Sequence, residues 1–147
     1  MRDQCQVFLS YASANHDVAE RIESGLSLAG MRIWTDGTIT PGEDWVSAVE
    51  RGVKQSDVFV VLVGEDFPAA GLVMYELGFI VSEQRSRGGI LLPVILAGAG
   101  DQMLPTYLRQ FQMIDARAMG TDELVAAIAA IIATANMTKA TALASSG

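Results

Sequence analysis

The sequence predicts a three-layer α/β sandwich with a parallel sheet of five strands. Runs typical of strands alternate along the chain with runs typical of amphipathic helices, a pattern that favours βαβ units. The run from Asp57 to Gly64 is apolar on both faces, as expected of a central parallel strand that helices cover from both sides. At 147 residues the chain has the length of one domain, so we expect one fold and one site.

Five runs rich in β-branched and aromatic residues are the expected strands. In chain order they are Gln6 to Tyr11, Met31 to Asp36, Asp57 to Gly64, Ile90 to Leu96 and Phe111 to Ala116. A doubly wound sheet of five strands commonly takes the order 2-1-3-4-5, and its ligand crevice opens at the carboxyl ends of strands 1 and 3. We therefore expect functional residues directly after those two strands.

Helical patterns fill the intervals between the expected strands. Residues Asn15 to Ala29 carry apolar side chains at helical spacing, and Gly30 follows where a glycine commonly ends a helix. Further helices are expected from Trp45, around residues 71–79, and from Thr121, which two acidic residues follow.

The end of the chain differs in composition from the rest. Residues 137–147, "MTKATALASSG", are mostly small and polar and show no apolar periodicity. We expect a domain over residues 1–136 and a linker or disordered tail over residues 137–147.

Composition excludes several kinds of partner. Seventeen acidic against ten basic residues give a net charge of −7, which repels a phosphate backbone, so no direct contact with nucleic acid is expected. The longest apolar runs are shorter than the ~20 residues that a membrane-spanning helix needs, so no membrane partner is expected. The polar opening of the chain is unlike a signal peptide, which favours a cytoplasmic location.

The sequence lacks the residues that several kinds of catalysis require. Cys5 and His16 are the only cysteine and histidine, so no metal site is expected, and a Ser-His-Asp triad would have to use a histidine at a polar helix start. No G-x-G-x-x-G motif follows the first strand, and no G-x-x-x-x-G-K-[ST] motif occurs, so neither glycine-rich nucleotide-binding motif is present. A phosphoacceptor receiver domain shares the topology but needs an acidic pair after strand 1 and a lysine ending strand 5. Here residues 10–12 are Ser-Tyr-Ala and residues 115–117 are Asp-Ala-Arg.

One carboxylate, Glu76, stands in the otherwise apolar or glycine-containing run "GLVMYELGF". In a helix it shares a stripe with Val73, Phe79 and Ile80. A charge in such a stripe must reach solvent, find a partner or serve a purpose. Glu83 continues nearly the same stripe, so one interpretation is a solvated helix edge, and the other is a functional carboxylate.

Four motifs in order resemble the Toll/interleukin receptor (TIR) domain family, of the bacterial kind. They are "VFLSYAS", "IWTDGTITPGEDW", "SDVFVVLVG" and "LVMYELGF", and the resemblance covers residues 6–135. The family has a flavodoxin-like fold, which agrees with the topology expected from the strand pattern. Many bacterial and plant members cleave NAD at its nicotinamide-ribose bond, and many animal members are adaptor modules.

The resemblance implies site residues by motif position. Glu76 matches the catalytic glutamate of the NAD-cleaving members. The substrate-binding residues implied with it are Ser10, Tyr11, Trp34, Asp36 and Leu72. Leu72 departs from the family, because the enzymatic members often carry a tryptophan there. The loop after strand 2, with Gly37, Pro41 and Gly42, is the expected gate of the crevice.

Three of these residues have plain structural alternatives. Tyr11 fits ordinary core packing as well as ligand binding. A tryptophan such as Trp34 is more often a core residue, although its ring could cover the crevice. Asp36 also suits the start of a turn.

The resemblance also implies partners and products. NAD is then a substrate, so no cofactor is expected, and the products are nicotinamide and ADP-ribose or a cyclic isomer. We expect self-association through TIR-TIR contacts, a sensor domain fused after the C-terminus, and a role as the effector of an antiviral defence protein. Two alternatives stay open: a catalytically silent TIR-TIR interaction module, and an enzyme resembling nucleoside deoxyribosyltransferases, which use a glutamate in a related fold.

Overall fold

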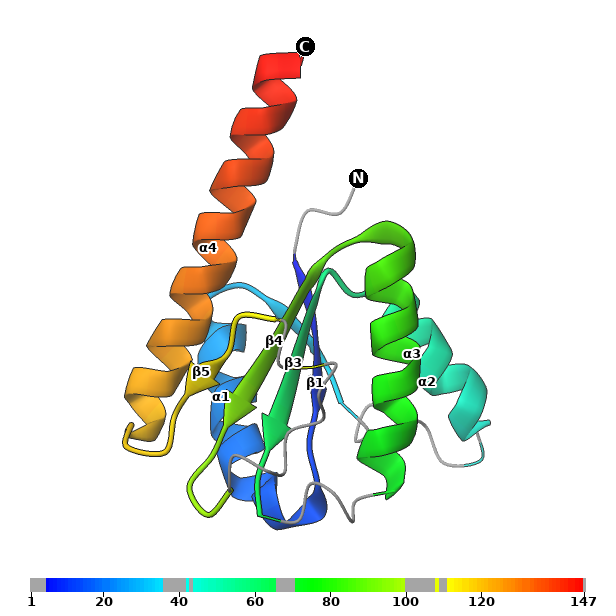
Figure 1. The fold of residues 1–147 in the computed structure, drawn as a ribbon, viewed down its shortest axis with the longest axis vertical. Helices are drawn as coiled ribbons and strands as arrows, with labels where there is room; N and C mark the ends of the chain where they lie inside the picture. The colour runs from blue at the N-terminus through cyan, green and yellow to red at the C-terminus, as the bar shows by residue number, and fades with distance from the viewer. Residues whose placement is uncertain are drawn as a thin grey trace.

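Five parallel strands form one sheet between two layers of helices in the computed structural model (Figure 1). The structure describes residues 5–35, 42, 44–65, 71–99, 108 and 111–146, and it describes their side chains except at residues 13, 45, 71–76, 87 and 136–146. In chain order the elements are β1 (Gln6–Ser10), the 3-10 helix η1 (Ser13–Asn15), α1 (His16–Leu28), β2 (Arg32–Trp34), α2 (Trp45–Gln55), β3 (Val58–Val63), α3 (Gly71–Arg87), β4 (Ile90–Ile95), β5 (Ile114–Asp115) and α4 (Thr121–Ser146).

The strand order is β2-β1-β3-β4-β5, which confirms the order expected from the sequence. β1 pairs with β2 on one side and with β3 on the other, so the winding of the sheet reverses between β1 and β3. Helices α2 and α3 contact each other on one face of the sheet, and α1 and α4 contact each other on the other face (Figure 1). This arrangement places the expected crevice at the carboxyl ends of β1 and β3.

Strand β3 divides the apolar interior into two cores. All six of its residues are buried, and alternate side chains point to opposite faces of the sheet. Phe59, Val61 and Val63 enter the α2/α3 core, which also contains Phe8, Leu77 and Ile80. Val58, Val60 and Leu62 enter the α1/α4 core, which also contains Val7, Leu9, Ile22, Leu26 and Ile128.

Helix α1 ends as its sequence predicts. Its buried residues Ala19, Ile22 and Leu26 recur at helical spacing. Beyond the helix, Gly30 has a φ of 90° and donates its backbone N–H to the carbonyl of Ser27 at 3.0 Å. Met31 donates to the carbonyl of Leu26 at 3.1 Å. These two bonds form a Schellman motif, which turns the chain directly into β2.

Close aromatic packing joins β1, β2 and α2. The rings of Phe8 and Trp34 stack with their centroids 4.5 Å apart and their planes 13° apart. The ring of Trp34 also lies against Gly52 of α2, where a Cβ would stand 2.5 Å from Cε2 of the tryptophan. Gly52 therefore allows α2 to approach the short edge strand β2.

A network of buried hydrogen bonds connects α2 to the amino end of the sheet. The buried Gln6 donates from Nε2 to Oγ of Ser56 at 3.0 Å and to the carbonyl of Gly52 at 3.4 Å. Ser56 donates in turn to the same carbonyl at 2.7 Å. The amide N–H groups of this buried glutamine are therefore paired, at the edge of the sheet opposite the expected crevice.

Helix α4 continues to Ser146, through most of the segment 137–147 that the sequence predicts as a linker or disordered tail. It extends beyond the amino ends of the strands (Figure 1). The residues from Met137 onward include alanine, leucine, methionine and lysine, which have high helix propensity. The helix propensity of these residues accounts for the continuation of α4, because the sequence after residue 136 has no apolar periodicity that would give the helix a buried face.

Two glycines inside helices give a matched test of this packing. Gly52→Ala adds a methyl group against a rigid, buried ring, so we expect the free energy of unfolding to fall by about 1–2 kcal/mol, after the gain in helix propensity is included. Gly78 of α3 has open space around its Cβ position, so Gly78→Ala is expected to raise that free energy by about 0.5–1 kcal/mol. Urea denaturation of both variants measures the difference, and equal effects would contradict the packing described for Trp34.

Candidate functional site

The carboxyl edge of the sheet brings together the ends of β1 and β3 and the starts of α1 and α3 (Figure 1). β1 ends at Ser10, which pairs with Val61, and Gly64 directly follows β3. His16 begins α1, and Gly71 begins α3. The sequence therefore folds so that the expected functional segments meet at one edge.

Ser10 and Tyr11 lie on opposite faces of the sheet. Ser10 is fully buried and follows Phe8 by two residues, which places it on the face that α2 and α3 cover. Tyr11 packs against the α1/α4 core. The structure thus brings Ser10, and not the ring of Tyr11, to the face that carries α3.

The ring of Tyr11 lies beside the first residue of α1. Its centroid is 6.1 Å from that of His16, with an angle of 44° between the two planes, and it is partly buried. His16 itself is exposed and lies 3.7 Å from Oε2 of Glu20. Tyr11 therefore lies on the α1 side of the carboxyl edge, and its contact with a ligand stays a prediction.

Trp34 takes part in the packing of the α2/α3 core. It is 7% exposed, and its ring is held between Phe8 and Gly52. Trp34 is the last residue of β2, and Thr35, which follows it, is also buried. The structure therefore gives Trp34 a packing role, and a contact of its ring with a ligand stays a prediction.

Helix α3 carries Glu76 and Leu72 in its first half, and their side chains lie outside the described residues. In the helix register Glu76 stands one turn before Ile80, which is fully buried together with Leu77. Of the expected loop, Asp36, Gly37 and Pro41 also lie outside the described residues. Gly42 has a φ of 88°, which favours glycine.

Asn15, which the sequence does not single out, lies at the carboxyl edge of the sheet, directly before α1. It precedes α1 as the capping residue, yet its side chain makes no capping hydrogen bond. The residue is partly buried, and within the part of the chain that the structure describes its Nδ2 atom is covered and has no hydrogen-bond partner. An unpaired buried donor costs about 1–3 kcal/mol, so this atom needs an explanation.

Gly64 explains how Asn15 is held. A Cβ on Gly64 would overlap with Nδ2 of Asn15 and stand 2.8 Å from its Oδ1, so the amide group packs directly on the backbone after β3. Nearby, Glu65 is exposed and reaches over Gly98, whose φ is 90°. In the sequence Asn15 stands at the start of an expected helix, where an asparagine normally acts as a cap.

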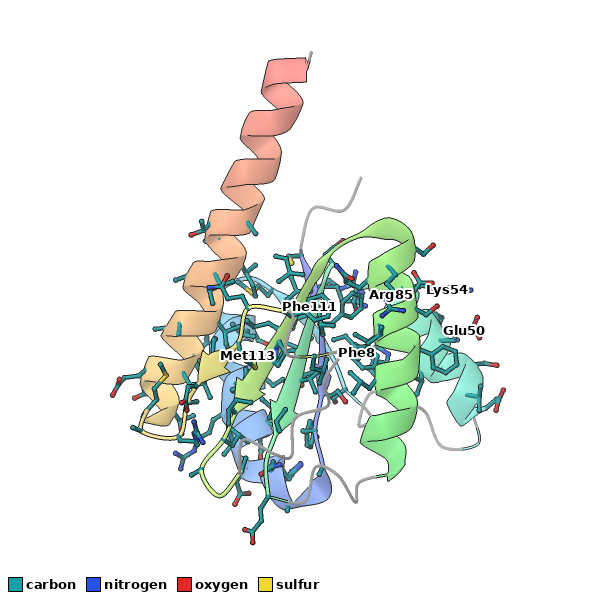
Figure 2. All side chains as sticks on the ribbon, in the orientation of Figure 1. Phe8, Glu50, Lys54, Arg85, Phe111 and Met113 are labelled. Atoms are coloured by element: carbon teal, nitrogen blue, oxygen red, sulfur yellow. The ribbon has the colours of Figure 1, made fainter. Side chains whose placement is uncertain are left out.

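Two charged pairs in the described residues join side chains close in sequence. On α2, Nζ of Lys54 lies 2.9 Å from Oε1 of Glu50, and hydrogen bonding to this carboxylate raises the pKa of Lys54 (Figure 2). At the end of β5, Arg117 donates to both carboxylate oxygens of Asp115, from Nε at 2.9 Å and from an η nitrogen at 2.8 Å. These side-chain bonds, and a backbone bond from the same arginine, lower the pKa of Asp115 from 3.8 to about 2.

Two further observations concern only the residues that the structure describes. They contain no group of three or more His, Cys, Asp or Glu side chains placed to hold a metal ion. None of their helices combines the length and the apolar character that crossing a membrane requires.

The chain belongs to the TIR domain family, whose model matches residues 7–132. This match confirms the family expected from the four motifs. Comparison with curated protein sequences gives no match.

Three solved structures share the fold at low identity. The RPS4 and RRS1 TIR domain heterodimer aligns with a TM-score of 0.69 at 10% identity, over 90% of this chain and 97% of that chain. The CMP N-glycosidase BcmB of Clostridium botulinum aligns with a TM-score of 0.59 at 16% identity, over 86% and 98%. The TIR domains of the activated Roq1 resistosome, which directly recognizes the pathogen effector XopQ, align with a TM-score of 0.59 at 19% identity, over 63% of this chain and 58% of that chain. This chain therefore spans less than two thirds of the Roq1 chain.

The Asp115 carboxylate gives a test of the geometry at the end of β5. Because Arg117 lowers its folded pKa, the pair stabilises the protein above pH 3.8, and this contribution is lost as the pH falls through about 2. In Arg117→Gln we expect the midpoint of Asp115, followed by carboxyl-carbon NMR, to move up toward 3.8. Arg85→Gln on α3 is the control and should leave the midpoint near 2, and an unchanged midpoint in Arg117→Gln would contradict the assignment.

Proposed function

We propose that this TIR domain is an NAD glycohydrolase whose catalytic carboxylate is Glu76. It cleaves the bond between nicotinamide and ribose and releases nicotinamide with ADP-ribose or a cyclic isomer. The observation that carries the proposal is the position of Glu76 in α3, the helix that follows the central strand and begins at the carboxyl edge.

The surroundings of this position on the helix support a functional charge. Leu77 and Ile80, one and four residues further on, are fully buried in the α2/α3 core. Ser10, also buried, ends β1 on the same face of the sheet. A carboxylate among apolar walls acts on a nearby cation more strongly than it would in water.

The reaction needs no second carboxylate as an acid. The nicotinamide of NAD is a pyridinium, so it departs as a neutral molecule when the bond electrons pass to its nitrogen. Positive charge then grows on the ribose, as in the oxocarbenium-like transition states of glycosidases. The carboxylate stabilises that charge and can hold the ribose hydroxyls by charge-assisted hydrogen bonds.

The comparison with a CMP N-glycosidase supports this class of reaction. That enzyme has the same fold as this chain over 98% of its length, and its name states that it cleaves the N-glycosidic bond of a nucleotide. A fold alone does not establish a substrate. The comparison therefore supports N-glycosidic cleavage in general, and the choice of NAD comes from the motif position of Glu76.

The proposal extends to regulation. The segment with Gly37, Pro41 and Gly42 follows β2 and is the proposed gate of the crevice. Association of several TIR domains would fix such a gate, in keeping with the heterodimer and resistosome that share the fold. We place this domain as the effector of a defence protein in which a fused sensor triggers that association.

Release of free nicotinamide from NAD tests the proposal. We expect Glu76→Gln to lower the rate at least about 100-fold, because the charge that stabilises the transition state is lost. Glu83→Gln is the matched control, since it removes a carboxylate seven residues further along α3, and it should retain the wild-type rate.

The same assay separates the alternative substrates. CMP and deoxynucleosides are offered in parallel with NAD, and cleavage of either in place of NAD would replace the proposed substrate. Equal nicotinamide release by wild type and Glu76→Gln would remove Glu76 from the mechanism.

A catalytically silent TIR-TIR interaction module is the second candidate, favoured by the TIR heterodimer that shares the fold. It predicts concentration-dependent dimerisation in sedimentation velocity runs, with no NAD consumed at any concentration. Nicotinamide release that rises with the associated fraction would contradict this candidate and support the enzyme.

A further inference from the structure

An open groove of about 720 Å³ runs along the junction of α1 and α4. The two helices lie side by side on the face of the sheet that α3 does not cover (Figure 1). They approach each other closely at Gly25, where a Cβ would stand 2.5 Å from Cγ1 of Val125. Both residues line the groove together with Ser24, so the small residues of α1 leave space above this contact.

Leu28 is an apolar side chain of the groove that the protein itself leaves uncovered. It is the last residue of α1 and is 91% exposed, whereas Val46, the next most exposed large apolar residue among those described, is 41% exposed. A single exposed leucine is common on protein surfaces. Because Leu28 lies at a groove, however, a partner seated there would remove its apolar area from water, which favours binding.

The charged residues of the groove give it a negative sign. Asp17, Glu20 and Asp122 line it, against one cation, Arg21. Within the part of the chain that the structure describes, Asp17 and Asp122 form no ion pair, so their charge is available to a partner. Lysine or arginine side chains of a partner are therefore attracted to this surface.

The groove has the length of a short helix. From Asp17 to Leu28 its lining residues follow α1 for about 16 Å, and a helix of about three turns spans that length. Two packed helices present a groove between their surface ridges into which a third helix fits. An amphipathic helix bound in this way is a common mode of protein recognition.

We propose that the α1/α4 groove binds a basic amphipathic helix of a partner protein. Its lysine or arginine side chains face Asp17 and Asp122, and an apolar side chain packs on Leu28. A second copy of this chain fits less well, because two grooves of the same negative sign would meet and each chain carries a net charge of −7. The inference goes beyond the proposed function and does not depend on NAD cleavage.

A helical peptide of defined composition tests the proposal. The probe is a fluorescein-labelled, alanine-based peptide of about 15 residues with lysines and leucines on one face, and its control carries glutamate in place of each lysine. We expect the wild-type protein to raise the fluorescence anisotropy of the lysine peptide and not that of the glutamate peptide. No change with the lysine peptide, or equal binding of both peptides, would overturn the inference.

Variants of exposed residues locate the binding site without disturbing the core. Leu28→Ser removes the apolar contact, so we expect it to weaken binding of the lysine peptide at least about tenfold. Asp122→Asn should weaken binding about two- to fivefold, as expected for the loss of an exposed charged pair. Glu123→Gln is the matched control, because it removes the next carboxylate of α4, which does not line the groove, and it should leave binding unchanged. Wild-type binding by Leu28→Ser, or equal effects of Asp122→Asn and Glu123→Gln, would contradict the proposed site.

A variant that fills the groove separates a partner helix from a second copy of the chain. Ser24→Trp places a large ring at an exposed position of the groove, so we expect it to abolish peptide binding. Sedimentation velocity of the protein alone should give the same association state for this variant and for wild type. A lower association state in Ser24→Trp would show that a second copy occupies the groove and would overturn the inference. None of these measurements reads nicotinamide release, so failure of the proposed function leaves the inference standing.

Discussion

The burial of β3 on both faces is the constraint on which the rest of the structure depends. Every residue from Val58 to Val63 is fully buried, so helices have to cover both faces of the sheet. The neighbours of β3 are parallel strands, and parallel neighbours require crossover connections, which run in opposite directions from the middle of the sheet. The carboxyl ends of β1 and β3 are left between the two helix layers as a consequence. The site is thus positioned by a strand that supplies only apolar side chains to the two cores.

The same alternation that builds the two cores divides the candidate site. Ser10 belongs to the face of α3, and Tyr11 belongs to the face of α1, because consecutive residues of a strand point in opposite directions. A small ligand on one face would contact only one of them. A dinucleotide is long enough to have its reacting ribose near α3 and another part near Tyr11, so the division of residues is compatible with one substrate that crosses the edge.

The sequence predicts those features that depend on periodicity and on local backbone chemistry. The central place of β3 follows from a run that is apolar throughout, the strand order is the one that doubly wound sheets of five strands commonly take, and the end of α1 follows from Gly30. The continuation of α4 to Ser146 was missed because helix propensity, and not a buried stripe, continues it. The packing of Trp34 on Phe8 could not be decided either, since an aromatic residue at a strand end suits a core and a ligand platform equally. Asn15 gives no signal, because only coordinates show that its capping bond is absent and its amide is buried.

The fold occurs both in a TIR domain heterodimer and in an N-glycosidase, so the fold alone does not decide between an enzyme and an interaction module. Individual residues must therefore distinguish an enzyme from an interaction module. Position 76 of α3 is such a residue, because it stands beside Leu77 and one turn before Ile80, which are both fully buried. A carboxylate next to apolar neighbours loses part of its hydration, which costs free energy unless the charge is used or paired. An interaction module that binds partners through its outer surfaces does not use a charge at this position. The proposed enzyme does, because the charge stabilises the cation that forms on the ribose.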